Sequence, residues 1–174
     1  MKVYVNSILY PVKTLGPGKR VGIWFQGCSI RCPGCMSVHT WERKKEYETN
    51  TREVIKETLK YKCSGITISG GEPFEQPKAL KEILTELNKK TEDIIVYSGM
   101  KMEEIIGKFP WIKTLCSVLI SEPFVAELKT DKTWKGSDNQ TATVFKNRKF
   151  YEKWLNEKNK KKLQIINNTI VGIL

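Results

Sequence analysis

Short apolar segments of strand character alternate along this chain with segments of helical periodicity, and this alternation restricts the fold more than any other feature. The strand-like segments are rich in β-branched or aromatic residues and lie at 21–25, 65–69, 94–97 and 117–120. Apolar residues recur at helical spacing over 51–62, from Pro77 onward, and over 101–108. Strands separated by helices form βαβ units. The sequence therefore predicts an α/β protein with a mainly parallel sheet.

The carboxyl-terminal part of the chain, residues 146–174, has a different character. Lysine and arginine crowd the segment 146–162, where a stripe of apolar residues predicts an amphipathic basic helix, through Phe150, Tyr151, Trp154 and Leu155. From 163 to 174 the pattern predicts a short β-hairpin that turns at Asn167-Asn168. The default role of the basic segment is a solvated helix face; docking to an acidic protein and binding of nucleic acid stay open as alternatives, which the sequence alone does not separate.

Length and composition bound the class of protein. The chain has 174 residues, of which 40% are hydrophobic and 28% charged, as expected of one soluble domain spanning 1–174. No apolar run approaches the roughly 18 residues of a membrane-spanning helix, and the first ten residues do not resemble a secretory signal. The five cysteines are odd in number and three of them cluster, which argues against a disulfide framework. We therefore expect a cytoplasmic protein with no membrane partner.

Three of the cysteines form the run Cys28-x3-Cys32-x2-Cys35, directly after the first strand-like segment. Pro33 and Gly34 place this run in a loop. Three thiolates leave one position of a metal centre open to a substrate or cofactor, whereas four would complete a structural zinc site or an ordinary cubane cluster. The pattern predicts a catalytic metal site. A zinc site with His39 as a fourth ligand stays open as an alternative.

Other polar and glycine-rich segments follow the next two strand-like segments. Ser69-Gly-Gly-Glu-Pro73 ends the second, and Tyr97-Ser-Gly99 ends the third. Because chemistry collects at the carboxyl ends of parallel strands, we expect both to lie beside the cysteine loop. Two glycines allow the backbone to approach a ligand closely, and the Glu72 carboxylate can hold an ammonium group.

The cysteine run followed by Gly-Gly-Glu-Pro resembles the signature of the radical S-adenosylmethionine enzymes. Within that superfamily the chain is similar to the anaerobic ribonucleotide reductase activating proteins over residues 14 to about 140. The stretches that carry this resemblance are Gly16-Pro-Gly18 with Arg20, Gln26-Gly-Cys28, Cys32-Pro-Gly-Cys35, Thr40-Trp41, Ser69–Pro73, Tyr97–Gly99, Pro123-Phe124 and Trp134–Gln140. The tail from Lys146 lies outside it.

The chain departs from the pattern of these activating proteins at three places. Leu15 stands where the family usually has Asp, and Ser37 stands where it usually has Asn. Ser121-Glu122 replaces the Asp-Gly that the family favours before Pro123.

The resemblance implies a fold and a set of site residues. The fold is an incomplete (βα) barrel, open on one side, to which this chain adds its basic helix and hairpin. Cys28, Cys32 and Cys35 are implied to ligate three irons of a [4Fe-4S] cluster. S-adenosylmethionine is implied to bind the fourth iron, with contacts from Gly34, Cys35, Met36, Gly70, Gly71, Glu72, Pro73 and Ser98.

The resemblance also implies an activity. One electron cleaves S-adenosylmethionine to a 5′-deoxyadenosyl radical, which takes hydrogen from a glycine of a large partner protein and leaves a glycyl radical there. The electron is expected from a low-potential donor such as flavodoxin or ferredoxin. Two other functions stay open: a radical enzyme that modifies RNA or a peptide, and a non-enzymatic zinc or iron–sulfur module.

Overall fold

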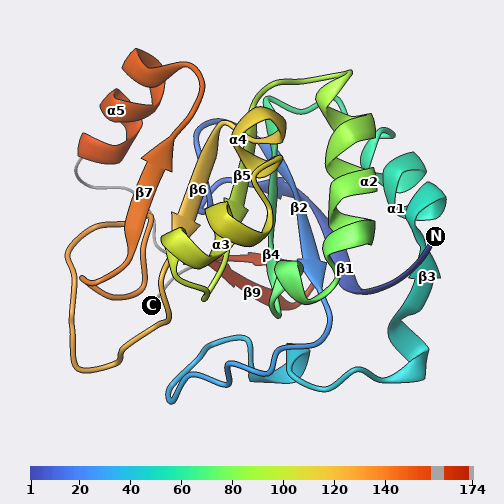
Figure 1. Ribbon diagram of the computed structural model, residues 1–174, viewed down its shortest axis with the longest axis horizontal. Helices are drawn as coiled ribbons and strands as arrows, with labels where there is room; N and C mark the ends of the chain where they lie inside the picture. The colour runs from blue at the N-terminus through green and yellow to red at the C-terminus, as the bar shows by residue number, and fades with distance from the viewer. Residues whose placement is uncertain (158–162, 173–174) are drawn as a thin grey trace.

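The computed structural model describes residues 1–157 and 163–172. Its largest element is a seven-stranded sheet in the order β3-β1-β2-β4-β5-β6-β7 (Figure 1). The strands are β1 (Lys2–Val12), β2 (Arg20–Phe25), β3 (Glu48–Asn50), β4 (Gly65–Gly70), β5 (Ile94–Tyr97), β6 (Val118–Ser121) and β7 (Thr141–Val144).

The four strands at the centre of this sheet are the ones that the sequence predicts. β2, β4, β5 and β6 pair in parallel, which confirms the mixed α/β class and the parallel centre. The sequence did not predict β1, β3 or β7, which pair antiparallel at the two sides. These strands lie toward the edges and are only partly buried, so they lack the continuous apolar run of a central parallel strand.

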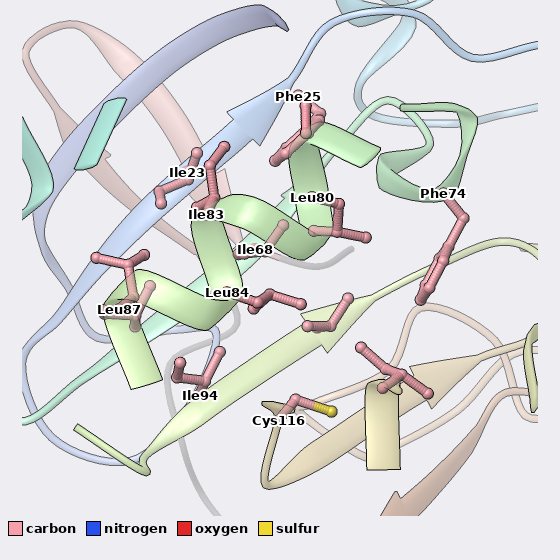
Figure 2. Packing of buried hydrophobic residues seen from close by; sticks show 14 of the residues in the cluster. Ile23, Phe25, Ile68, Phe74, Leu80, Ile83, Leu84, Leu87, Ile94 and Cys116 are labelled. Carbon is pink, nitrogen blue, oxygen red and sulfur yellow. The ribbon is translucent and has the colours of Figure 1, made fainter. Parts of the chain in front are cut away.

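Four helices cover one face of the sheet: α1 (Thr51–Thr58), α2 (Pro77–Asn88), α3 (Met102–Lys108) and α4 (Ile112–Leu115). Figure 2 shows α2 seated on this face, with Leu80, Ile83, Leu84 and Leu87 fully buried against strand residues such as Ile68. Pro77 at the first turn and the Asn50 cap, which accepts from the Glu53 N–H, explain why α2 and α1 begin where they do. No helix in the described ranges has the length and hydrophobicity needed to cross a bilayer.

The opposite face is covered by the carboxyl-terminal segments. Helix α5 (Arg148–Asn156) buries Tyr151 and Trp154 against Ile95, Val118 and Ile120. Phe150 is 51% exposed, so its predicted place in the buried stripe is wrong. The strands β8 (Leu163–Ile166) and β9 (Thr169–Gly172) pair as a separate two-stranded sheet. The predicted helix positions Lys158, Lys160, Lys161 and Lys162 lie outside the described residues.

A buried arginine connects neighbouring strands at the edge of the sheet where the parallel strands begin. Arg20 is fully buried at the start of β2, and its guanidinium lies 2.7 Å from the Asp93 carboxylate. It also donates to the Thr67 hydroxyl and to the Ile66 and Pro17 carbonyls. Removing one partner of a buried ion pair is strongly destabilising. Arg20 lies at the edge of the sheet where the parallel strands begin, opposite the edge where they end. We infer that its role is to stabilise the fold.

Candidate functional site

The carboxyl ends of β2, β4 and β5 surround a cavity of about 170 Å³. Figure 1 shows the long loop after β2 passing beyond the arrowhead of that strand. The cavity is lined by nearly all the site residues that the sequence predicts: Cys28, Cys32, Gly34, Cys35, Met36, Gly70, Gly71, Glu72 and Ser98. Pro73 is buried at the start of the short helix η3 (Pro73–Glu75) and is not among the residues that line the cavity, so its role as a cofactor contact stays a prediction.

The cysteine loop is closed at its neck by backbone hydrogen bonds. The Gly27 N–H donates to the Thr40 carbonyl at 2.7 Å, and the Cys28 N–H donates to the Trp41 carbonyl at 2.9 Å. Inside the loop, the Cys35 N–H donates to the Cys32 carbonyl at 3.1 Å. Thr40 and Trp41, which resemble the activating proteins in sequence, thus bring the loop back to its own start. The geometry explains how one short segment holds three thiols beside one cavity.

Burial governs the acidity of two of these thiols. It raises the pKa of Cys28 and of Cys32, because the charged thiolate loses contact with water. Backbone N–H groups of Ile30 and Arg31 at Cys28, and of Phe124 at Cys32, act in the opposite direction. A metal that binds these sulfurs would supply the positive charge that their partly buried setting lacks.

The three thiols line one cavity, which is the arrangement that a cluster with several irons needs. Within the described part of the chain, no three Cys, His, Asp or Glu side chains converge on a position for a single metal ion. His39, the fourth ligand of the alternative zinc site, is exposed and lines a second, smaller hollow, whereas the three cysteines line the main cavity. A cubane presents separate irons to separate thiolates, so its ligands need only line one cavity. The three cysteines meet that requirement.

Gly70, the last residue of β4, and Gly71, which follows it, lie where two backbone segments approach too closely for a side chain. Gly70 has φ +103°, and a side chain there would lie 2.4 Å from the Phe25 backbone nitrogen. A side chain on Gly71 would lie 2.3 Å from the Gly27 carbonyl oxygen. The Gly71 and Glu72 N–H groups donate to the carbonyls of Phe25 and Gly27, each at 2.8 Å. The Gly-Gly-Glu turn is therefore held directly against the start of the cysteine loop.

Glu72 joins the turn after β4 to the turn after β5. Its carboxylate accepts from the Phe74 N–H at 3.0 Å, the Ser98 hydroxyl at 2.9 Å and the Gly99 N–H at 2.8 Å. The residue is only 1% exposed, and burial raises the pKa of its carboxyl from 4.5 to about 7. The hydrogen bonds oppose this shift but do not cancel it. Glu72 is thus a buried carboxyl group, and the three groups that donate hydrogen bonds to it are uncharged.

The raised pKa of Glu72 predicts a specific dependence of stability on pH. The folded protein holds this proton more tightly than the unfolded chain, so its free energy of unfolding should fall as pH rises from 4.5 to about 7. We expect the wild-type value to fall by about 3 kcal/mol more than that of Glu72→Gln across this window. Denaturant unfolding of both proteins without cofactor, at pH 4.5 to 8, measures the difference. Parallel curves for the two proteins would contradict the raised pKa.

Several residues that sequence reasoning left without a role also line the cavity: Ile30, Tyr97, Phe124, Gly136, Gln140 and Gly172. Gln140 accepts from the Gly136 N–H at 2.7 Å and donates to the Glu122 carbonyl at 3.0 Å. The Tyr97 hydroxyl donates to the Trp134 carbonyl at 3.0 Å. The stretch Trp134–Gln140 thus shapes the loop that carries Phe124. Its motif was visible in the sequence, but only the fold reveals that it faces the cysteines.

One departure from the activating proteins has a structural consequence. Glu122 has φ +85°, a left-handed conformation that glycine adopts without cost and that other residues adopt rarely. Its carboxylate accepts from the Met102 N–H at 3.0 Å, and its own N–H donates to the Met100 carbonyl at 3.0 Å. These bonds help to hold the strained backbone, and the carboxylate caps the first turn of α3.

The family model of the 4Fe-4S single cluster domain matches residues 14–143. The anaerobic ribonucleoside-triphosphate reductase-activating protein of Salmonella typhimurium is 32% identical over 144 residues, which cover 75% of this chain and 92% of that protein. The protein of the same name from Enterobacteria phage T4 is 29% identical over 140 residues, which cover 76% of this chain and 88% of that protein. The pyruvate formate-lyase-activating enzyme of Clostridium pasteurianum is 39% identical over 75 residues, 40% of this chain and 32% of that enzyme.

Among solved structures, QueE from Escherichia coli is similar with a TM-score of 0.48 and 18% identity, over 57% of this chain and 53% of that one. The matched region of the family model contains the three cysteines, the Gly-Gly-Glu turn and Gln140. The chain therefore belongs to the 4Fe-4S single cluster domain family, among the anaerobic ribonucleoside-triphosphate reductase-activating proteins.

Proposed function

We propose that this protein is a radical S-adenosylmethionine enzyme that installs a glycyl radical on anaerobic ribonucleoside-triphosphate reductase. The observation that carries the proposal is the lining of one cavity by three thiols and a Gly-Gly-Glu turn. Similarity over 92% of the length of an activating protein supplies the class of partner. On this proposal residues 1–174 act as one domain, and the sheet is an incomplete (βα) barrel whose open side admits the partner.

Cys28, Cys32 and Cys35 would ligate three irons of a [4Fe-4S] cluster, which leaves the fourth iron for the amino and carboxylate groups of S-adenosylmethionine. When bound, cluster and cofactor supply the one-electron cleavage that yields a 5′-deoxyadenosyl radical, the species that takes hydrogen from the partner's glycine. Burial raises the pKa of Cys28 and Cys32, and the backbone N–H groups of Arg31, Ile30 and Phe124 offset part of this rise.

The cofactor would bind along the turns that follow β4 and β5. Glu72 is a buried carboxyl with three neutral donors, and the amino group of S-adenosylmethionine is the complementary group that we place beside it. Gly70 and Gly71 would lead the backbone past the methionine moiety, and Gly34, Cys35 and Met36 would flank the adenine. Because the Ser98 hydroxyl donates to Glu72 and accepts from the Met100 N–H, its part is to orient Glu72 as well as to border the cofactor.

The walls of the cavity would protect a reactive species from water. Ile30, Met36 and Phe124 present apolar side chains to the cavity, and the Phe124 ring lies 3.4 Å from the position of a side chain at Gly34. Excluding water prevents side reactions of radical intermediates. We place the electron donor among small low-potential proteins such as flavodoxin or ferredoxin, because the net charge of +11 favours association with an acidic partner.

The function is tested with the reconstituted protein and the anaerobic reductase from the same organism. We expect about four irons and four sulfides per chain. With S-adenosylmethionine and a chemical reductant, we expect 5′-deoxyadenosine and a glycyl-radical doublet in the electron paramagnetic resonance spectrum of the reductase. A reductase in which the radical-bearing glycine is replaced by alanine is the control and should give no doublet.

Two outcomes would contradict the proposal. Zinc in place of iron, bound by the three cysteines, would make the protein a non-enzymatic module. Cleavage of S-adenosylmethionine that never yields a radical on the reductase, but modifies RNA or a peptide instead, would replace the partner.

A further inference from the structure

The carboxyl-terminal hairpin β8–β9 lies on the sheet face opposite the helices α1–α4. Ile166 and Val171 are buried there, and they pack against Leu9, Val12, Leu15 and Trp24. Leu15 is one of the positions at which the chain departs from the activating proteins, and it is 3% exposed in this contact. The whole hairpin lies beyond residue 143, where the match to the family model ends. The hairpin is thus an addition to the part of the chain that the family model describes.

Among the described residues, Ile166 and Val171 form the buried side of the hairpin. Ile166 is 8% exposed, whereas its neighbour Ile165 is 74% exposed, because successive strand residues face opposite ways. In the described ranges, the Gln164 side chain accepts from the Lys13 N–H at 2.5 Å and donates to the Pro11 carbonyl at 2.8 Å. The Thr14 hydroxyl lies 3.4 Å from the Gln164 side-chain oxygen and 3.4 Å from the Val171 carbonyl oxygen. A two-stranded hairpin is marginally stable alone, so its place depends on this small contact.

The hairpin also forms part of the wall of the proposed site. Gly172 of β9 lines the main cavity together with Cys35 and Met36. The whole of β9, Thr169–Gly172, borders the second hollow, which Met36, Ser37 and His39 close from the other side. In Figure 1, β9 runs across the strands of the large sheet. The strand therefore lies between two hollows and beside the segment that directly follows the third cysteine.

We propose that the hairpin β8–β9 controls access to the active site. Seated on the sheet, it closes one side of the cavity and supports the segment Cys35–Ser37. Displaced, it opens that side to the glycine-bearing loop of the partner. The inference rests on the proposed function, because that function requires a polypeptide backbone to reach the cavity, and the seated hairpin occupies part of its border.

The test compares two substitutions of the same kind at adjacent positions. Ile166→Asp places a carboxylate in the buried contact and should release the hairpin, whereas Ile165→Asp changes an exposed position and is the matched control. With the reconstituted protein alone, a chelator should bleach the cluster absorbance at least about fivefold faster in Ile166→Asp than in the wild type. Ile165→Asp should bleach at the wild-type rate. Ile166→Ala, a milder change of the same contact, replaces Ile166→Asp if that variant does not fold.

A second measurement separates an access element from a fixed wall. If the hairpin must leave to admit the partner, Ile166→Asp should activate the reductase at least as fast as the wild type, and should form more 5′-deoxyadenosine without partner. Equal bleaching in all the variants overturns the proposal. Faster bleaching with slower activation also overturns it, because the hairpin would then be a wall that the reaction needs.

The two proposals fail in distinguishable ways. If the wild type itself yields no glycyl radical, the proposed function fails, while the chelator comparison still reports whether the hairpin shields the cluster. If the wild type holds no iron, alkylation of the three thiols by iodoacetamide replaces the chelator. Faster alkylation in Ile166→Asp than in Ile165→Asp supports the shielding, and equal rates overturn it.

Discussion

Replacing Cys28, Cys32 or Cys35 by serine, one at a time, is expected to abolish activation of the partner. Each thiol lines the same cavity, and no other cysteine lines it in the described part of the chain. Loss of one ligand from a three-cysteine set leaves two thiolates, too few to hold a cluster that already lacks a fourth protein ligand. Iron and sulfide in the reconstituted variants should fall well below the wild-type content, and 5′-deoxyadenosine should be undetectable.

The matched control for these variants is Cys63→Ser. Cys63 is half-buried and packs at the border of the main core, away from the cavity. We expect it to retain the full iron content and wild-type activation, because it contributes no ligand. A cysteine of the cluster loop that could be replaced without loss of iron would remove the basis for the proposed cluster.

Gly71→Ala is expected to lower both cofactor binding and cluster content. The added methyl group would lie 2.3 Å from the Gly27 carbonyl oxygen, a backbone atom one residue before Cys28. Because a backbone cannot move aside as a flexible side chain does, the Gly-Gly-Glu turn and the cysteine loop must separate. Overpacking of this kind costs about 1–3 kcal/mol. We expect S-adenosylmethionine affinity to fall at least about tenfold, measured by equilibrium binding alongside iron analysis.

Gly107→Ala provides the control for this substitution. Gly107 lies in α3, and a side chain there would meet nothing within 4 Å. The change should therefore leave cofactor affinity and iron content unaltered and should stabilise the protein by about 0.5–1 kcal/mol, since alanine restricts the unfolded chain. Unchanged cofactor affinity in Gly71→Ala would contradict the placement of the Gly-Gly-Glu turn at the binding site.

The sequence by itself determined the parallel centre of the fold. The segments 21–25, 94–97 and 117–120 are mainly apolar on both faces, as expected of central strands of a parallel sheet, which are covered on both sides. The segment 65–69 is apolar on one face and carries the buried Thr67 on the other. The same pattern placed the cysteine run and Gly-Gly-Glu-Pro directly after two of these strands. Since parallel strands end at one edge of a sheet, the parallel arrangement was enough to predict that these motifs lie at the same edge. The cysteine spacing then indicated a metal centre with an open position.

The tertiary structure decided what each of these residues touches. The sequence predicts that Gly70 and Gly71 let the backbone approach a ligand; the fold shows that both also lie against the backbone of Phe25 and Gly27. The sequence predicts that the Glu72 carboxylate can hold an ammonium group; the fold adds three donors from two separate turns that hold this carboxylate in a buried position. Contacts of this kind join residues far apart in the chain, so no local pattern contains them.

The positions of the outer strands and of the carboxyl-terminal hairpin also depend on tertiary contacts. β1 and β7 pair antiparallel beside the parallel strands, and their partly buried residues lack the uniform apolar pattern that marks β2 and β5. The hairpin β8–β9 was visible as a local pattern, but its seat on Leu9, Val12, Leu15 and Trp24 was not. Local propensity and periodicity determine which segments become strands and helices. Which surfaces those segments cover depends on the packing of the whole chain, and that packing places the end of the hairpin at the wall of the site.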